Sequence, residues 1–264
     1  MFLDGRFRLA FINTHRRGHR LEVTLTDPPR RNALSTQMRV ELIAELERAN
    51  ADPGVRVIIL KGAGRFFCSG GDLGAMPPKD RGEAASRLRQ IQILIGLLSD
   101  SPKGTIAVLT GPAVGLGSSL ATACDYIFMT TDAMFSFPFT RLGLMPDGGI
   151  LHTLGLRVGY AKAKQIMLEA RTIDAGEALK IGLADVVLPA EEMDVAVVDK
   201  ADLIASGAPL AIAAIKAVYR VNLLDKEQIF AAEQREQEAL YFSSDFAEGK
   251  AAFEQRRAAM FTGT

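Results

Sequence analysis

The sequence predicts an α/β core followed by an α-helical region. Two apolar runs, at 57–62 and 105–109, have the length and aliphatic content of buried strands. A glycine-rich turn follows each run, and segments with helical spacing lie between and beyond them. After Glu191 the patterns are helical throughout. We therefore expect an α/β core over 1–190 and a helical region over 191–264.

Composition indicates an ordinary globular protein with no bias towards nucleic acids or membranes. The chain has 264 residues, 48% of them hydrophobic, and its 31 Lys and Arg equal its 31 Asp and Glu. No apolar run reaches the length of a membrane span. Residues 1–11 have the form of neither a signal peptide nor an organelle presequence, so we expect a cytoplasmic protein.

Cysteine and histidine usage predicts neither disulfides nor a metal site. The two cysteines, Cys68 and Cys124, form no CxxC pair, and the three histidines form no HExxH motif. This pattern is typical of a reduced compartment without structural zinc.

The other elements are predicted from periodicity and from Gly, Pro and Asp punctuation. We expect strands at 9–12, 21–25, 125–129 and 184–189, and helices near 38–46, 88–98, 157–170 and 172–178, with polar caps at Asn32 or Ser35, Asp225 and Ser244. The segment 14–20 is rich in His and Arg, but no aromatic residues are interleaved. It is therefore predicted to be a solvated hairpin turn rather than a nucleic-acid site.

The stretch 111–123, GPAVGLGSSLATA, follows the second buried strand. Gly111, Gly115 and Gly117 permit a turn in which the backbone approaches a ligand closely. A strand, a glycine turn and a buried helix start bring free N–H groups to one point. GxxxxGK[ST] is absent, and Leu120 stands where a GxGxxG motif needs its third glycine, so neither nucleotide motif is present. A turn that only feeds a core helix is the alternative.

A second glycine turn, FCSGGDL at 67–73, follows the first buried strand. The pair of turns resembles the enoyl-CoA hydratase/isomerase (crotonase) family, and the similarity extends from Asp27 to Phe253. It implies a spiral of ββα units with a C-terminal helical region that assembles into trimers or into hexamers made of two trimers. It also implies an acyl-CoA substrate, with coenzyme A entering as part of that substrate and no other cofactor or metal.

The resemblance assigns an oxyanion site to the two turns. In this family one backbone N–H from each turn binds the thioester oxygen, and the matching groups here are those of Gly71 and Leu116. Leucine is compatible with this role because only its N–H is used. Such preorganised donors stabilise the negative oxygen of an enolate. The alternative is that the two turns only pack together.

Substrate-contacting residues also follow from the resemblance. The loop of Arg31 and Ala33 would hold the adenine end of coenzyme A, and Phe253 of the tail would meet the coenzyme, sometimes across a subunit boundary. The remaining candidates surround the two turns and the acyl chain: Ser69, Gly70, Asp72, Leu73, Gly117, Ser119 and Phe139.

The acid/base positions differ from those of the hydratases. Hydratases of this family use two glutamates, and the matching residues here are Ser119 and Phe139. Asp147 instead matches the position at which Δ3,Δ2-enoyl-CoA isomerases of the family carry a catalytic carboxylate. Isomerisation needs one base, so Asp147 is the predicted proton shuttle. Because Pro-Asp-Gly is also a favoured turn sequence, a purely structural role is the alternative.

The leading hypothesis is an isomerase that converts 3-enoyl-CoA into 2-enoyl-CoA, with an apolar pocket of Phe137, Phe139, Leu144 and Met145 around Asp147. The alternatives are another crotonase-family reaction (hydration, thioester hydrolysis or dehalogenation) and a non-catalytic acyl-CoA-binding protein. Among lesser candidates, Asp72 is expected to fix its loop, Cys68 to pack, and His152 to lie on a helix surface or in the core.

Overall fold

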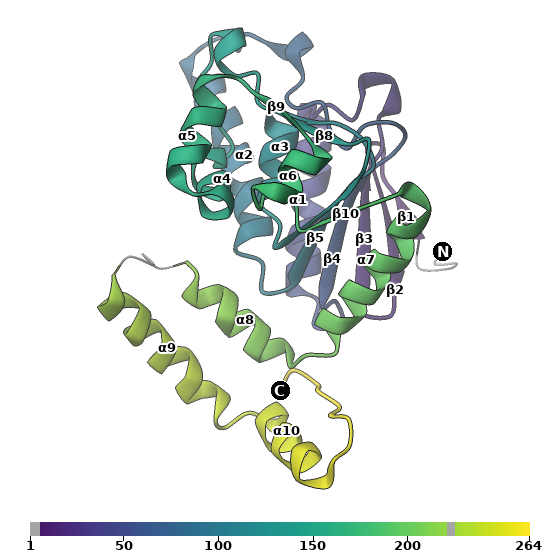
Figure 1. The fold of residues 1–264 in the computed structure, drawn as a ribbon, viewed down its shortest axis with the longest axis vertical. Helices are drawn as coiled ribbons and strands as arrows, with labels where there is room; N and C mark the ends of the chain where they lie inside the picture. Colours follow the sequence, from purple (N-terminus) through teal and green to yellow (C-terminus); the bar gives the residue numbers. More distant parts are fainter. Residues whose placement is uncertain (1–5, 221–224) are drawn as a thin grey trace.

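The computed structural model describes residues 6–220 and 225–264, and its centre is a seven-stranded sheet (Figure 1). The strand order is β1-β2-β3-β4-β5-β7-β10, with a separate three-stranded sheet in the order β6-β8-β9. The strands are β1 Arg6–Arg8, β2 Ile12–Arg17, β3 Arg20–Leu25, β4 Val57–Gly62, β5 Gly104–Leu109, β6 Ala113–Val114, β7 Tyr126–Thr130, β8 Met134–Ser136, β9 Thr172–Asp174 and β10 Val186–Leu188.

Strands β3, β4, β5, β7 and β10 run parallel, whereas β1, β2 and β3 are antiparallel. Every residue of β5 and the first four of β4 are buried, as expected for strands covered on both faces. The carboxyl ends of parallel strands meet at one edge. The loops that follow β4 and β5 therefore emerge side by side, which is where open α/β sheets bind ligands.

The chain forms helices that cover both faces of the sheet and helices that project from one end of the molecule. They are α1 Thr36–Ala51, α2 Arg81–Ser99, α3 Leu116–Thr122, α4 Ile150–Val158, α5 Tyr160–Leu168, α6 Ala175–Lys180, α7 Ala190–Ala205, α8 Pro209–Val218, α9 Lys226–Leu240 and α10 Ser244–Gln255. Alternate β4 residues point to opposite faces: Ile58 packs in the core formed with α1 and α2, and Ile59 packs against α7. The helical region predicted over 191–264 thus includes a helix, α7, that covers the sheet.

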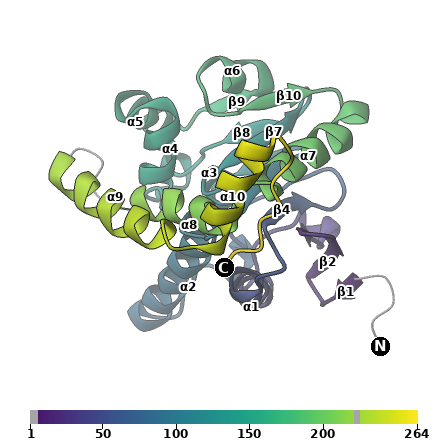
Figure 2. The same ribbon diagram turned by 90° about the horizontal axis from the view of Figure 1, so that it is seen from below.

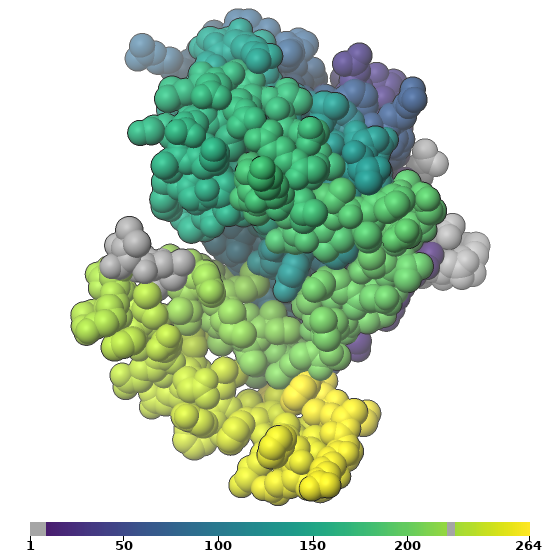
Figure 3. All heavy atoms as spheres, viewed as in Figure 1, coloured from purple at the N-terminus to yellow at the C-terminus, as the bar shows by residue number. Residues whose placement is uncertain are grey.

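Helices α8 to α10 extend from the end of the molecule opposite the loops that follow β4 and β5 (Figures 1 and 2). Arg56, just before β4, donates from Nη1 to the Ala205 carbonyl at 2.9 Å and so fixes the end of α7. The space-filling view shows α8 to α10 projecting from the body of the molecule (Figure 3). Exposed large apolar side chains in this region include Ile215 on α8, Phe230 on α9 and Phe242 just after α9. Residues 221–224, part of the stretch predicted to be helical, lie outside the described residues.

Several sequence-based boundaries were wrong. The helix predicted at 172–178 begins only at Ala175, because Thr172–Asp174 is strand β9. The strand predicted at 9–12 is β2, Ile12–Arg17, so the basic segment belongs to a strand and only Gly18 and His19 form the turn. The helix predicted at 157–170 is two helices, α4 and α5, separated at Gly159 with φ +80°. Ser243 rather than Ser244 caps α10, and Ser35 rather than Asn32 caps α1.

Among residues 6–220 and 225–264, no single helix is long and apolar enough to cross a membrane. Helices α7 and α8 reach that length and hydropathy only as a pair bent by 95°.

Asn32 ties together the loops that precede the site. Its fully buried amide accepts a hydrogen bond from the Asp27 N–H at 2.9 Å and donates to the carbonyls of Ala63 at 2.9 Å and Phe66 at 2.7 Å. Asn32 also has φ +55°, a left-handed conformation that asparagine tolerates better than most residues.

Replacing Asn32 by alanine is expected to lower the free energy of unfolding by about 3 kcal/mol, because buried backbone groups lose their partners. Urea denaturation monitored by circular dichroism measures the change. Gln37→Ala on the exposed side of α1 is the matched control and should change stability little. Equal stability of Asn32→Ala and wild type would contradict this role.

Candidate functional site

The site is built where the loops after β4 and β5 meet. Cys68 and Ala113 form a parallel β-bridge, and the Val114 N–H donates to the Cys68 carbonyl at 2.9 Å. The Phe67 N–H donates to the Pro112 carbonyl at 3.1 Å. These backbone contacts join the two glycine turns into one unit at the carboxyl edge of the sheet.

Glycine is required at the contact between the turns. A Cβ atom on Gly117 would lie 2.3 Å from the Cys68 carbonyl oxygen, and one on Gly70 would lie 2.7 Å from the Val114 oxygen. Gly70 also has φ +97°, which disfavours any larger residue. The predicted site residues Gly70 and Gly117 therefore act through backbone approach.

The two predicted oxyanion donors flank this contact. The Cβ position of Gly70 is 3.4 Å from the Leu116 nitrogen, so Leu116 starts α3 directly beside the first turn. Within the described part of the chain, neither the Gly71 N–H nor the Leu116 N–H donates a hydrogen bond. Both remain available to a thioester oxygen, as an oxyanion site requires.

Asp147 lies in the loop between a 3-10 turn at Thr140–Leu142 and α4, and a hydrogen bond joins this loop to α3. The Ser119 hydroxyl donates to the Asp147 backbone carbonyl at 3.1 Å. The next residue, Gly148, has φ +64°, and a Cβ there would lie 2.5 Å from Leu116 Cδ1. The Asp147 loop is thus fixed against the residue that supplies the second N–H.

The surroundings of Asp147 make it a stronger base than an ordinary aspartate. Burial raises the pKa of the half-buried carboxyl above its usual range, and the positive charge of Arg87 lowers it by a smaller amount. A raised pKa strengthens the carboxylate as a proton acceptor.

Arg87 is the site residue that sequence analysis missed. It lies on α2, and its Nη2 is 3.0 Å from the position that a Cβ on Gly71 would occupy. No motif includes it. Its helix was expected from the aliphatic spacing of Leu88, Ile91 and Ile95, and only the tertiary packing of α2 brings the guanidinium to the first turn.

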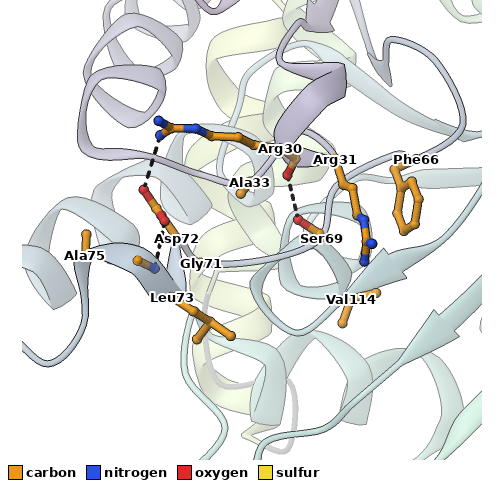
Figure 4. Close-up of a pocket in the computed structure, with 11 residues that line it drawn as sticks. Arg30, Arg31, Ala33, Phe66, Ser69, Gly71, Asp72, Leu73, Ala75 and Val114 are labelled. Atoms are coloured by element: carbon orange, nitrogen blue, oxygen red, sulfur yellow. Dashed lines mark hydrogen bonds and ion pairs between the residues drawn. The ribbon is translucent and has the colours of Figure 1, made fainter.

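A cavity of about 690 Å³ opens beside the first turn (Figure 4). Six of its lining residues were predicted site residues: Arg31, Ala33, Ser69, Gly71, Asp72 and Leu73. The rest of the lining consists of Arg30, Phe66, Gly74, Ala75 and Val114. The Arg31 guanidinium lies 5.3 Å from the centre of the Phe66 ring, a cation–π contact. Asp72 accepts from the Gly74 N–H at 3.0 Å and pairs with Arg30 at 3.7 Å, so it fixes its loop as predicted.

Residues 19–264 match the family model described as enoyl-CoA hydratase/isomerase. The chain belongs to this family, the crotonases. A probable enoyl-CoA hydratase of Rhodobacter capsulatus is 36% identical over 242 residues, covering 91% of this chain and 93% of that protein. A peroxisomal Delta(3,5)-Delta(2,4)-dienoyl-CoA isomerase of Arabidopsis thaliana is 33% identical, with 83% of each chain covered. The enoyl-CoA hydratase structure from Bacillus anthracis superposes with a TM-score of 0.91 at 27% identity, covering 96% of this chain and 100% of that one.

The crotonase fold predicted from the two turns is confirmed by this structural match. Ser119, which is fully buried, and Phe139, which is 6% exposed, are the residues that the resemblance matches to the two hydratase glutamates. Neither carries a carboxylate, and Asp147 is the carboxylate that the resemblance matches to the isomerase position.

The predicted apolar pocket around Asp147 is only partly formed. Phe137 and Phe139 are buried, but Leu144 is 43% exposed and Met145 is 74% exposed. The predicted role of Leu144 and Met145 in excluding water from Asp147 therefore stays a prediction. Phe253 is 85% exposed on α10, which lies at the opposite end of the molecule from the cavity.

The two lesser candidates, Cys68 and His152, lie in the core and on a helix surface respectively. Cys68 is fully buried, its Sγ accepts from the Gly70 N–H at 3.4 Å, and burial raises the pKa of its thiol to about 12. His152 is exposed on α4. No group of three or more His, Cys, Asp or Glu side chains among the described residues is arranged to hold a metal ion.

Gly117→Ala is expected to separate the two turns, because its Cβ would collide with the Cys68 carbonyl. We expect a loss of about 1–3 kcal/mol in stability and of most activity towards acyl-CoA. Gly176→Ala on α6 is the control, since its Cβ would meet only Asp174 Oδ1 at 3.5 Å. Thermal denaturation and turnover assays measure both variants; normal activity of Gly117→Ala would show that the close contact is unnecessary.

Proposed function

We propose that this crotonase is an isomerase that converts 3-enoyl-CoA into 2-enoyl-CoA. The observation that carries the proposal is the placement of Asp147. Its half-buried carboxyl belongs to a loop held by Ser119 and packed on Leu116, while both hydratase glutamate positions lack a carboxylate. One base beside an oxyanion site is the minimum that a double-bond shift requires.

In the proposed reaction the Asp147 carboxylate takes a proton from C2 of the 3-enoyl thioester. The electron pair of that C–H bond delocalises onto the thioester oxygen, forming a dienolate that the N–H groups of Gly71 and Leu116 bind. Asp147 then returns the proton to C4, which leaves the double bond between C2 and C3. Each oxyanion donor contributes about 3 kcal/mol to lowering the barrier.

The same residues disfavour hydration. Water addition needs a group that activates water and a group that moves a proton. The Ser119 hydroxyl donates to the Asp147 carbonyl, and Phe139 has no proton-transfer group. Hydration is the second candidate because several relatives are named hydratases, among them the Rhodobacter capsulatus protein. A loss of 2-enoyl absorbance on mixing with 2-enoyl-CoA would favour hydration.

We further propose that the cavity beside Arg31 and Ala33 receives coenzyme A. The exposed apolar side chains of α8 to α10 support the proposal of a homotrimer or a hexamer, in which Phe253 of one copy approaches the coenzyme bound to another. A cytoplasmic location also remains a proposal.

Asp147→Asn is expected to abolish the conversion of 3-enoyl-CoA, lowering kcat by at least about a hundredfold, while acyl-CoA binding persists. The absorbance of the conjugated enoyl thioester measures turnover, and calorimetry measures binding. Asp132→Asn, at an exposed turn aspartate, is the matched control. Unchanged turnover of Asp147→Asn would remove Asp147 from the mechanism.

The pH profile tests the environment of Asp147. Asp147 must be ionised to accept a proton, so kcat/KM should fall as the pH is lowered. Because burial raises the pKa of Asp147, this fall should occur at a pH above about 3.9, the ordinary aspartate value. Arg87→Gln removes the charge that lowers this pKa, so the acid limb should move to higher pH, whereas Arg89→Gln on the same helix should leave it in place. An acid limb that Arg87→Gln leaves unmoved would contradict this electrostatic account.

A further inference from the structure

Arg87 is a half-buried cation beside the proposed reacting groups, and it forms no ion pair with a carboxylate in the described part of the chain. Its Nη2 lies against Gly71, 3.0 Å from where a Cβ would stand. In the part of the chain that the structure describes, its guanidinium forms no hydrogen bond or ion pair. The mechanism proposed above leaves Arg87 without a contact to the substrate.

Arg87 belongs to a chain of interacting charges with one positive charge in excess. Arg30 pairs with Asp72 at 3.7 Å, Asp72 and Arg87 both act on Arg39, and Arg87 acts on Asp147. These are three cations and two carboxylates. Arg39 is buried and donates to neutral acceptors, the Leu34 carbonyl at 2.8 Å and Thr36 Oγ1 at 3.1 Å, which leave its charge in place.

We propose that Arg87 binds a carboxylate carried by the acyl group, so that the substrate is the mono-thioester of a short unsaturated dicarboxylic acid with coenzyme A. The inference rests on the proposed placement of the thioester at Gly71 and Leu116. The guanidinium presents planar donors that match a carboxylate in a bidentate pair. Because Arg87 lies next to Gly71, the second carboxylate of the substrate must be within a short chain of the thioester.

This placement also solves an electrostatic problem for the base. A substrate carboxylate near Asp147 would repel the ionised base and disfavour its charged form. Arg87, which already acts on Asp147, would interact with both negative groups and offset that repulsion. A neutral acyl chain would instead leave the guanidinium partly desolvated without a partner, which costs binding free energy.

Binding of unreactive saturated thioesters tests the proposal without requiring turnover. Adipyl-CoA and hexanoyl-CoA have acyl chains of equal carbon number, and glutaryl-CoA and pentanoyl-CoA form a second pair. Wild type is expected to bind one or both dicarboxylic thioesters at least about tenfold more tightly than their neutral partners, as a charge-assisted pair implies. Arg87→Gln should lose this preference, Arg87→Lys should retain part of it, and Arg89→Gln should retain all of it.

Several outcomes would overturn the proposal. A wild-type protein that binds the neutral thioesters as tightly as both acids would show that no carboxylate is recognised. Equal weakening of acids and neutral thioesters in Arg87→Gln would place Arg87 on the shared thioester oxygen. Failure of every acyl-CoA to bind would instead contradict the proposed function itself, so the two failures are distinguishable.

Discussion

The close backbone contact between the two glycine turns is the constraint on which the site depends. Gly117 packs on the Cys68 carbonyl and Gly70 on the Val114 oxygen, at distances that no side chain allows. The contact fixes Gly71 and Leu116 relative to each other before any substrate arrives. Oxyanion donors are effective because they are preorganised, so the proposed oxyanion site depends on the sheet edge that carries the turns.

The second constraint is the attachment of the base to that unit. The Ser119 hydroxyl, at the position that the resemblance matches to a hydratase glutamate, donates to the Asp147 carbonyl. In the proposed function this side chain supplies no carboxylate of its own and holds the loop of the proposed base. Burial then raises the pKa of Asp147, and the charge of Arg87 limits the rise. These features are the basis for proposing proton transfer between carbons rather than the addition of water.

Local patterns in the sequence predicted the parts of the fold that local physics determines. The buried strands at 57–62 and 105–109, the glycine turns and the helix of Leu88 and Ile91 all appear where expected. The two-helix arrangement of α4 and α5 depends on packing: a Cβ on Gly155 would lie 2.4 Å from the Tyr160 ring, a contact that sequence spacing does not indicate. Arg87 was missed for the same reason.

The central claim is that the site moves a proton and adds no water. Mass spectrometry of the thioester formed from 3-enoyl-CoA tests this most directly, when combined with the absorbance of the conjugated product. The account predicts a conjugated 2-enoyl-CoA of unchanged mass, and a 2-enoyl-CoA substrate that gains no mass on prolonged incubation. A product heavier by one water molecule, formed at a rate comparable with isomerisation, would contradict the account.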